Sequence, residues 1–137
     1  MSQFQDFLMD DFAQVESIEK MVPMGGKERK MIFKPITAAV GDEIRKSSRK
    51  ITFQKGQKVV ETDQDQYVLK LIAETLVYPD LKNKELQDAW GVMGADNLLK
   101  AMKGRMLDGE YATLCGIVNE VNGYDKSMDD LVEEAKN

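Results

Sequence analysis

The chemistry open to this chain is limited by the reactive side chains that it lacks. The sequence contains no histidine and a single cysteine, Cys115, so it lacks the commonest general base near neutral pH and the commonest metal ligand. Cys115 falls on the apolar face of a predicted helix, where no histidine is available to activate its thiol. We therefore expect Cys115 to be a buried structural thiol, and we expect neither a metal site nor a cofactor.

Carboxylates are plentiful, and the last predicted helix carries Asp129, Asp130, Glu133 and Glu134. Two carboxylates can hydrolyse a glycoside when their environments split their pKa values. These four side chains have no basic or nucleophilic partner nearby, and no aromatic residues suggest a sugar cleft. The sequence therefore predicts a protein that is not an enzyme.

Positive charge is concentrated in residues 27–58. Residues 1–61 carry 11 Lys and Arg against 9 Asp and Glu, whereas residues 62–137 carry 8 against 15. Phe33 and Phe53 interleave with this charge, as in a strand platform on which nucleic-acid bases stack. The alternative, which we favour for this acidic chain, is the solvent face or protected edge of a sheet. The basic residues are Lys27, Arg29, Lys30, Lys34, Arg45, Lys46, Arg49, Lys50, Lys55 and Lys58.

The N-terminal segment, residues 1–16, is amphipathic. Its large apolar side chains follow helical spacing and would share one face of a helix. Such a helix could pack on its own domain, or it could dock into a groove on a partner. The residues on this face are Phe4, Phe7, Leu8, Phe12 and Val15.

Four of the nine methionines stand where full burial is hard. Met21 and Met24 flank a Pro-Gly-Gly turn, and Met93 and Met106 fall in connections between predicted helices. Flexible thioethers at such places suit a surface that adapts to varied apolar partners. They could equally fill irregular gaps in a small core. We take these four, with the apolar face of the N-terminal segment, as candidate partner-binding residues.

The sequence before position 62 predicts short strands and one helix. Gly25-Gly26 separates two apolar runs, which is typical of a hairpin turn. Thr37 is the expected N-cap of a short helix, and Gly56 is the expected turn of a second, smaller hairpin. Together with their connections, these elements form a β-ribbon region over residues 17–61.

Residues 62–137 follow a helical pattern. Pro79 ends the first of these helices, and the helices are short enough to need one another for stability. A chain of 137 residues is one ordinary domain. The expected fold is α+β and mainly α, with a small N-terminal β-hairpin region followed by a bundle of short helices. The expected N-caps of these helices are Thr62, Asn83, Asp108 and Ser127.

An ordered set of short motifs in the second half resembles one known family. The set begins with Glu74-Thr75-Leu76, which leads to Tyr78-Pro79-Asp80-Leu81, and it ends with Asn122-Gly123. It resembles the XkdN-like tail assembly chaperones of phages and prophages that infect Gram-positive bacteria. Between those ends it includes Glu85-Leu86-Gln87, Trp90, Gly91 to Gly94, Leu98-Leu99 and Leu107 with Gly109-Glu110-Tyr111. We take Tyr78, Pro79, Leu81, Trp90, Gly91, Gly94, Gly109, Tyr111 and Gly123 as structural residues of the motif.

The resemblance implies a chaperone that binds the tape measure protein and keeps it soluble during tail assembly. It also implies the tail tube protein as a second partner, self-association, and absence from the mature virion. No apolar run approaches the roughly 20 residues that cross a bilayer, and a lone cysteine suits a reducing compartment. We therefore expect the cytoplasm of the bacterial host. The alternatives are a nucleic-acid-binding phage protein that uses residues 27–58 and a structural tail component.

Overall fold

The structure is a computed structural model, and it describes residues 3–12 and 15–124. The helix expected from Ser127, with its four carboxylates, lies outside the described residues. The described part is α+β, as the sequence predicts. Its strands are β1 (Ile18–Met24), β2 (Lys27–Phe33), β3 (Arg49–Gln54), β4 (Gln57–Thr62) and β5 (Leu76–Tyr78). Its α-helices are α1 (Ala38–Ser47), α2 (Gln64–Thr75), α3 (Lys84–Ala89), α4 (Ala95–Lys103) and α5 (Asp108–Val121).

Strands β1 and β2 form an antiparallel hairpin whose turn is Gly25-Gly26. Both glycines have positive φ angles, +64° and +88°, as a two-residue hairpin turn requires. The short strand β5 pairs with the other edge of β2, so the sheet has the order β1-β2-β5. Alternate side chains are buried toward the C-terminal end of each strand, and these are Val22 and Met24 in β1 and Met31 and Phe33 in β2.

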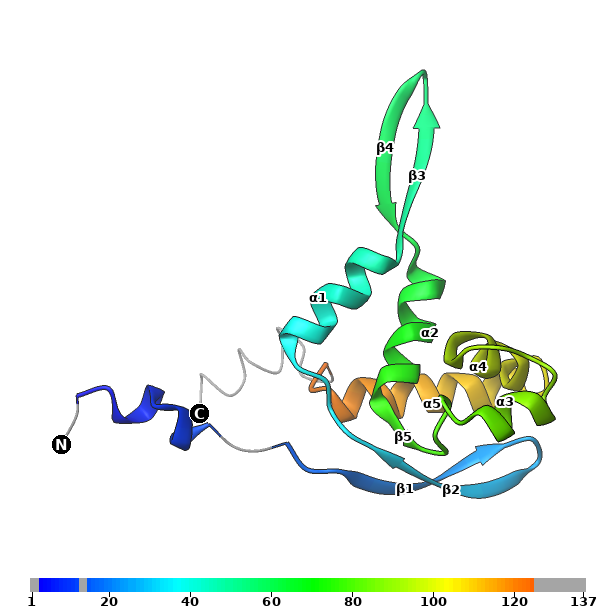
Figure 1. The fold of residues 1–137 in the computed structure, drawn as a ribbon, viewed down its shortest axis with the longest axis horizontal. Helices are drawn as coiled ribbons and strands as arrows, with labels where there is room; N and C mark the ends of the chain where they lie inside the picture. Colours follow the sequence, from blue (N-terminus) through cyan, green and yellow to red (C-terminus); the bar gives the residue numbers. More distant parts are fainter. Residues whose placement is uncertain (1–2, 13–14, 125–137) are drawn as a thin grey trace.

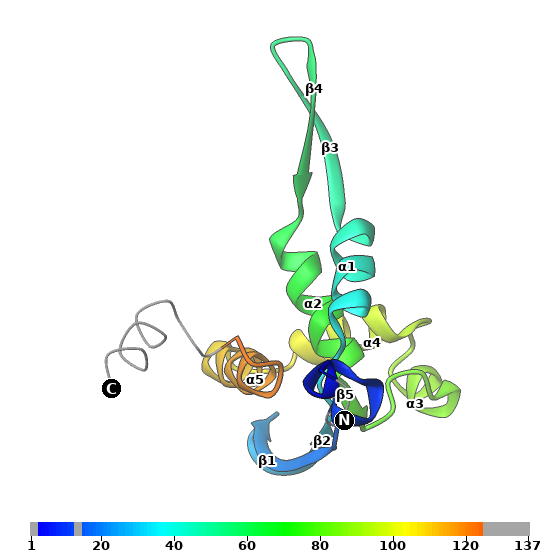
Figure 2. The same cartoon turned by 90° about the vertical axis from the view of Figure 1, so that its left-hand side faces the viewer.

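The core lies between this sheet and helices α2, α4 and α5. Helix α5 packs against β1, and α2 contacts both α4 and α5. Figures 1 and 2 show α1 beside α2 above this layer, and the two helices are in contact. Each of the three core helices contributes two almost fully buried side chains: Leu71 and Ile72, Leu98 and Leu99, and Leu114 and Val118.

The β3–β4 hairpin projects away from the rest of the molecule (Figure 1). Its strands pair only with each other in the described structure. Ile51, Phe53 and Val60 lie exposed along it, and Ile51 stands directly opposite Val60 in the register. The hairpin is therefore an appendage that adds little to the hydrophobic core.

Of the two possibilities left open for the N-terminal segment, packing on its own domain as a helix is contradicted for the residues described. They form two single 3-10 turns, Gln5–Phe7 and Met9–Asp11, in place of an amphipathic helix. All the described side chains of residues 3–12 are exposed. A helix this short is marginal in water unless an apolar face packs against something, and here none of that face is buried.

Two of the expected N-caps are confirmed and two are displaced by one residue. The Thr37 hydroxyl accepts a hydrogen bond from the backbone N–H of Val40 at 3.3 Å, and the Asn83 side chain accepts one from Leu86 at 2.9 Å. Asp63 caps α2 in place of Thr62, and its carboxylate accepts a hydrogen bond from the backbone N–H of Gln66, the third residue of the helix, at 3.2 Å. Helix α5 has Leu107 at its N-cap in place of Asp108. No described helix has both the length and the apolar character needed to span a bilayer.

Candidate partner-binding groove

A groove of about 380 Å³ opens beside the turn of the β1–β2 hairpin. Its floor is apolar and includes the side chains of Met24, Met31 and Met102. Its wall is formed by the connection from β5 to α3 and by the end of α3. The wall residues are Tyr78, Pro79, Leu86 and Trp90, so residues from three distant parts of the sequence meet here.

The wall is held in place by one glutamine of the family motif. Gln87 lies in α3, and its Nε2 donates a hydrogen bond to the carbonyl of Leu81 at 2.8 Å. Its Oε1 accepts a hydrogen bond from the backbone N–H of Gly94 at 3.0 Å. These two bonds tie both connections of α3 to the helix, and they fix the position of Trp90 at its C-terminus.

The opposite side of the groove is held by Glu110 in the first turn of α5. One carboxylate oxygen accepts hydrogen bonds from the backbone N–H groups of Gly25 at 3.2 Å and Leu107 at 2.8 Å. The other oxygen accepts one from Gly26 at 3.2 Å. These hydrogen bonds lower the pKa of the Glu110 carboxyl from its ordinary value, and the bond from Leu107 has the largest effect. The positive charge of Arg29 lowers this pKa further.

Glu110 was predicted from the sequence only as a residue of the motif, with no role of its own. The signal that could have identified it is its position three residues after the N-cap, where a glutamate returns to the N-cap N–H. Glu110 also accepts hydrogen bonds from Gly25 and Gly26, which lie 85 and 84 positions before it in the sequence. No local pattern predicts that contact.

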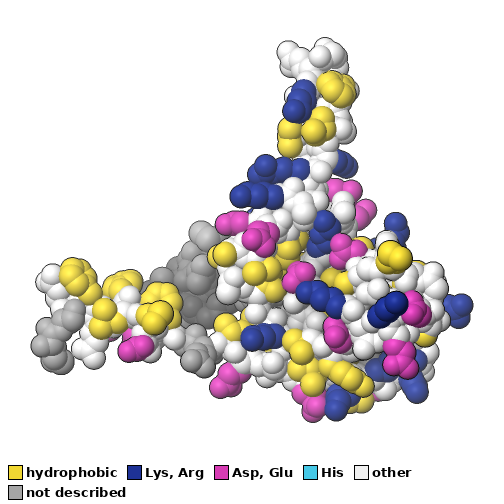
Figure 3. All heavy atoms as spheres, viewed as in Figure 1, with side chains coloured by type: hydrophobic (Ala, Val, Ile, Leu, Met, Phe, Trp, Pro, Cys, Tyr) yellow, Lys and Arg dark blue, Asp and Glu magenta, His cyan; other side chains and the backbone are white. Residues whose placement is uncertain are grey.

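Positive charge rims the groove. The Lys30 ammonium lies 5.5 Å from the centroid of the Tyr78 ring, and the Arg105 guanidinium lies 5.8 Å from that of Trp90. Arg29 donates a hydrogen bond from Nε to the carbonyl of Met24 at 2.8 Å. Figure 3 shows hydrophobic and basic side chains next to one another over the β1–β2 hairpin. This arrangement suits an apolar segment flanked by carboxylates.

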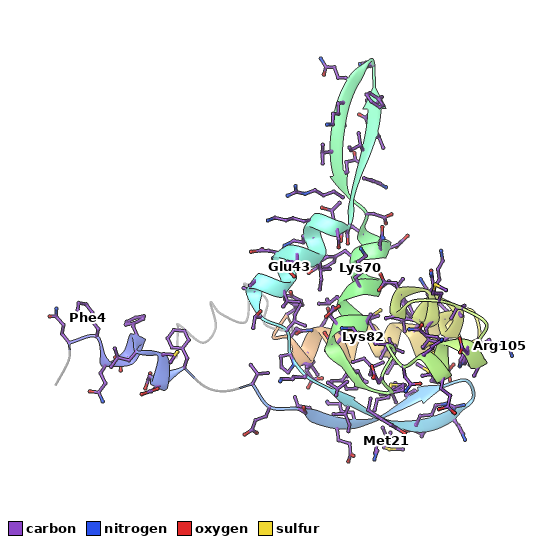
Figure 4. The ribbon with its side chains drawn as sticks, viewed as in Figure 1. Phe4, Met21, Glu43, Lys70, Lys82 and Arg105 are labelled. Atoms are coloured by element: carbon purple, nitrogen blue, oxygen red, sulfur yellow. The ribbon has the colours of Figure 1, made fainter. Side chains whose placement is uncertain are left out.

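The structure separates the four candidate methionines. Met24 is buried and lines the groove, so the expectation that the tight turn would expose it is wrong. The alternation of the strand turns Met24 inward and leaves Met21 pointing away from the body (Figure 4). Met93 is exposed in the α3–α4 connection, and Met106 is half-buried against the core.

The residues taken as structural parts of the motif divide into three groups. Tyr78, Pro79 and Trp90 line the groove, while Leu81 is buried and Tyr111 is half-buried against the core. The glycines have another role. Gly91, Gly94 and Gly123 have φ angles of +69°, +93° and +82°, and Gly109 stands in the first turn of α5.

The groups that could carry other chemistry are dispersed. Cys115 is half-buried against the core, and burial raises the pKa of its thiol, so the thiolate is disfavoured. Within residues 3–12 and 15–124, no three His, Cys, Asp or Glu side chains gather as metal ligands. The basic residues divide between β2 beside the groove and the distant α1 and β3–β4 region (Figure 1).

The chain belongs to the family of phage XkdN-like tail assembly chaperones, whose model matches residues 4–136. This confirms the resemblance drawn from the motifs. The chain is 32% identical over 120 residues to the phage-like element PBSX protein XkdN of Bacillus subtilis strain 168. The match covers 87% of this chain and 80% of XkdN.

A second relative from the same organism is the uncharacterized protein YqbN. It is 34% identical over 125 residues, and the match covers 90% of this chain and 83% of YqbN. The crystal structure of YqbN superposes with a TM-score of 0.67 at 26% identity, over 91% of this chain and 99% of that one. The family carries a non-enzymatic role in phage tail assembly.

Proposed function

We propose that this chain binds the tape measure protein in the groove beside the β1–β2 turn and keeps it soluble during tail assembly. The observation that carries the proposal is the groove itself: an apolar floor rimmed by Arg29, Lys30 and Arg105. Three residues of the family motif, Tyr78, Pro79 and Trp90, form part of its wall. Membership of the family indicates a role in phage tail assembly. The groove offers a surface that fits a helix of the client, the tape measure protein.

The chemistry of the groove defines its client. An amphipathic helix would place Leu, Met or aromatic side chains against the methionine floor, and Asp or Glu beside the basic rim. Micromolar affinity is about −8 kcal/mol. One Leu-sized anchor contributes roughly 2 kcal/mol, and association itself costs several kcal/mol.

A groove of this size holds only about two such anchors, so each contact is weak and reversible. Several copies along one long client would still shield it. They would also release it readily when tail tube subunits polymerise around it. The tail tube protein is therefore a second expected partner at this stage.

Co-expression with the tape measure protein of the same phage or prophage tests the proposal. The wild-type chain should keep that protein in the soluble fraction. The groove variant Lys30→Glu/Arg105→Glu should lower the soluble amount several-fold, because both side chains are exposed and their charges face the client. The control Phe53→Ser removes an exposed aromatic ring on the β3–β4 hairpin and should behave as wild type. Equal aggregation with and without the wild-type chain would refute the proposal.

We place this activity in the cytoplasm of the bacterial host and expect the protein to be absent from finished particles. Mass spectrometry of purified virions tests this second part. Stoichiometric amounts of the chain in the particle would favour a structural tail component.

A further inference from the structure

Positive charge is concentrated on the β3–β4 hairpin and on the end of α1 that precedes it. Of the 19 Lys and Arg, six lie in residues 45–60, where there is no Asp or Glu. The other 13 share the rest of the chain with all 24 Asp and Glu. Figure 3 shows basic side chains at the base of the hairpin and along it. All six cations are exposed, and they are Arg45, Lys46, Arg49, Lys50, Lys55 and Lys58.

Intramolecular contacts leave most of this charge unneutralised. Arg45 forms an ion pair with Asp42 at 2.8 Å. Within residues 3–12 and 15–124, the other five cations form no ion pair. These cations are also not the solvent side of a packed sheet, because none of residues 49–62 is buried. A bound polyanion would therefore displace only small counterions from the hairpin.

One face of the hairpin combines this charge with an exposed aromatic ring. Phe53 stands directly opposite Lys58, and Ile51 stands opposite Val60 two positions along. Because side chains alternate along a strand, both pairs share one face with Arg49. Phe53 is 74% exposed. An exposed ring flanked by cations is the arrangement on which the bases of a single strand stack.

We propose that this face of the β3–β4 hairpin binds single-stranded nucleic acid. A base stacks on Phe53, and backbone phosphates lie beside Arg49 and Lys58. Lys55, at the tip of the hairpin, contacts a third phosphate. The contact does not depend on the base, because every base has a face that can stack. This goes beyond the proposed function, because the groove beside the β1–β2 turn takes no part.

The dimensions of the hairpin favour a nucleic-acid strand over a protein partner. Each of its two strands has six residues. The hairpin is therefore about 20 Å long and about 10 Å wide, and one face offers roughly 200 Å². A stable protein interface buries about 800 Å² on each partner. Phosphate binding needs no such area, because its affinity comes mainly from the release of counterions.

The projection of the hairpin keeps bound phosphates away from the acidic body (Figure 1). Its tip stands about 20 Å from its base, and charges are largely screened beyond about 8 Å at physiological ionic strength. The 24 carboxylates of the chain all lie outside residues 45–60. A short strand can therefore bind along the hairpin with little repulsion from most of them.

Fluorescence anisotropy with the full-length chain tests the proposal. The probes are labelled oligothymidine DNA and oligouridine RNA of about 15 nucleotides, a duplex of the same length, and polyglutamate. Both single strands should bind, and with three phosphate contacts the logarithm of affinity should fall with that of salt with a slope of about −2. The duplex should bind more weakly, because its bases are already stacked on one another. Polyglutamate, which has no bases, should not bind.

Matched variants separate stacking from charge. Phe53→Leu removes the ring and should weaken single-strand binding by about five-fold or more, whereas Phe53→Tyr should keep it. Arg49→Gln/Lys58→Gln should weaken binding and make the salt slope shallower by about 1.4. Lys82→Gln/Lys84→Gln makes the same change of charge outside the hairpin and should bind as wild type. All these side chains are exposed, so circular dichroism should not change.

Four outcomes would overturn the proposal. The first is no binding of either single strand at about 50 mM salt, which would leave the cations as protection of the hairpin edges. The second is an equal loss in the two glutamine double variants, or wild-type affinity in Phe53→Leu. The third is binding of polyglutamate with the same dependence on Phe53, which would make the partner an acidic protein. The fourth is loss of binding in Lys30→Glu/Arg105→Glu but not in Arg49→Gln/Lys58→Gln, which would move the site to the groove.

Discussion

The side chain of Asn122 donates a hydrogen bond from Nδ2 to the hydroxyl of Thr75 at 3.0 Å. The same nitrogen donates to the carbonyl of Val118, also at 3.0 Å, and Oδ1 accepts a hydrogen bond from the backbone N–H of Ile36 at 2.9 Å. Asn122 follows α5, Thr75 ends α2, and Ile36 lies between β2 and α1. One carboxamide therefore ties together three elements that are distant in the sequence.

Asn122→Leu should destabilise the protein by about 1–3 kcal/mol, because Thr75 is fully buried and its hydroxyl loses this donor. Urea unfolding followed by circular dichroism measures the change. Asn119→Ala, at an exposed position of α5, is the matched control and should change stability by less than about 0.5 kcal/mol. An equal effect of the two substitutions would contradict the role given to Asn122.

The Glu110 carboxylate should make stability depend on pH. Its pKa is lowered in the folded state, so the stability that it contributes is complete above the ordinary glutamate pKa. That contribution is lost as the pH falls through the lowered pKa of the folded state. Glu110→Gln should therefore be less stable than wild type at pH 7, and the difference should shrink in acid. Denaturant unfolding of both proteins from neutral to acidic pH tests this.

The control for Glu110 is Glu120→Gln, which changes an exposed carboxylate on the same helix. Glu120 lies 3.7 Å from the Lys20 ammonium in an exposed ion pair, which contributes little to stability. A difference between Glu110→Gln and wild type that stays constant with pH would mean that the carboxylate charge is irrelevant.

The core and the β3–β4 hairpin should respond very differently to truncation. Leu98 is fully buried, and Leu98→Ala should cost about 2–5 kcal/mol through lost burial and a new cavity. Phe53→Ala removes a larger side chain, but that ring is exposed, so the cost should stay below about 0.5 kcal/mol. Thermal unfolding of both variants gives the comparison, and similar losses would show that the hairpin packs on the body.

Two glycines should respond to alanine with opposite signs. Gly26 has a φ of +88°, which an alanine adopts only at a cost of roughly 1 kcal/mol or more. Gly116 lies within α5, and an added Cβ would meet nothing within 4 Å. Gly116→Ala should therefore stabilise the protein by about 0.5–1 kcal/mol. Chemical denaturation curves of the two single variants measure both shifts.

Local signals in the sequence predict much of the backbone. Thr37 and Asn83 cap their helices because the cap bond spans three residues and needs no other part of the chain. The strand β5 escapes prediction because three residues are too few to show a period. It forms because β2 offers it an edge, and that is a tertiary effect.

The groove could not be predicted from the sequence, although its family motif was visible. Its floor and rim draw on residues from Met24 to Arg105, and the Glu110 contact that sets the β1–β2 turn joins positions far apart. Periodicity placed the apolar residues of the N-terminal segment on one face, but it could not tell what that face would meet. Trp90 was predicted to be structural because its side chain packs against neighbours and carries no catalytic group.

The projecting β3–β4 hairpin has a practical consequence. Its tip, Lys55-Gly56, is an exposed turn remote from the groove, and exposed tips are where chains best tolerate insertions. A peptide tag inserted there would let the protein be immobilised on a surface with its groove facing solution. Client polypeptides could then be captured and released by copies that are all held in the same orientation.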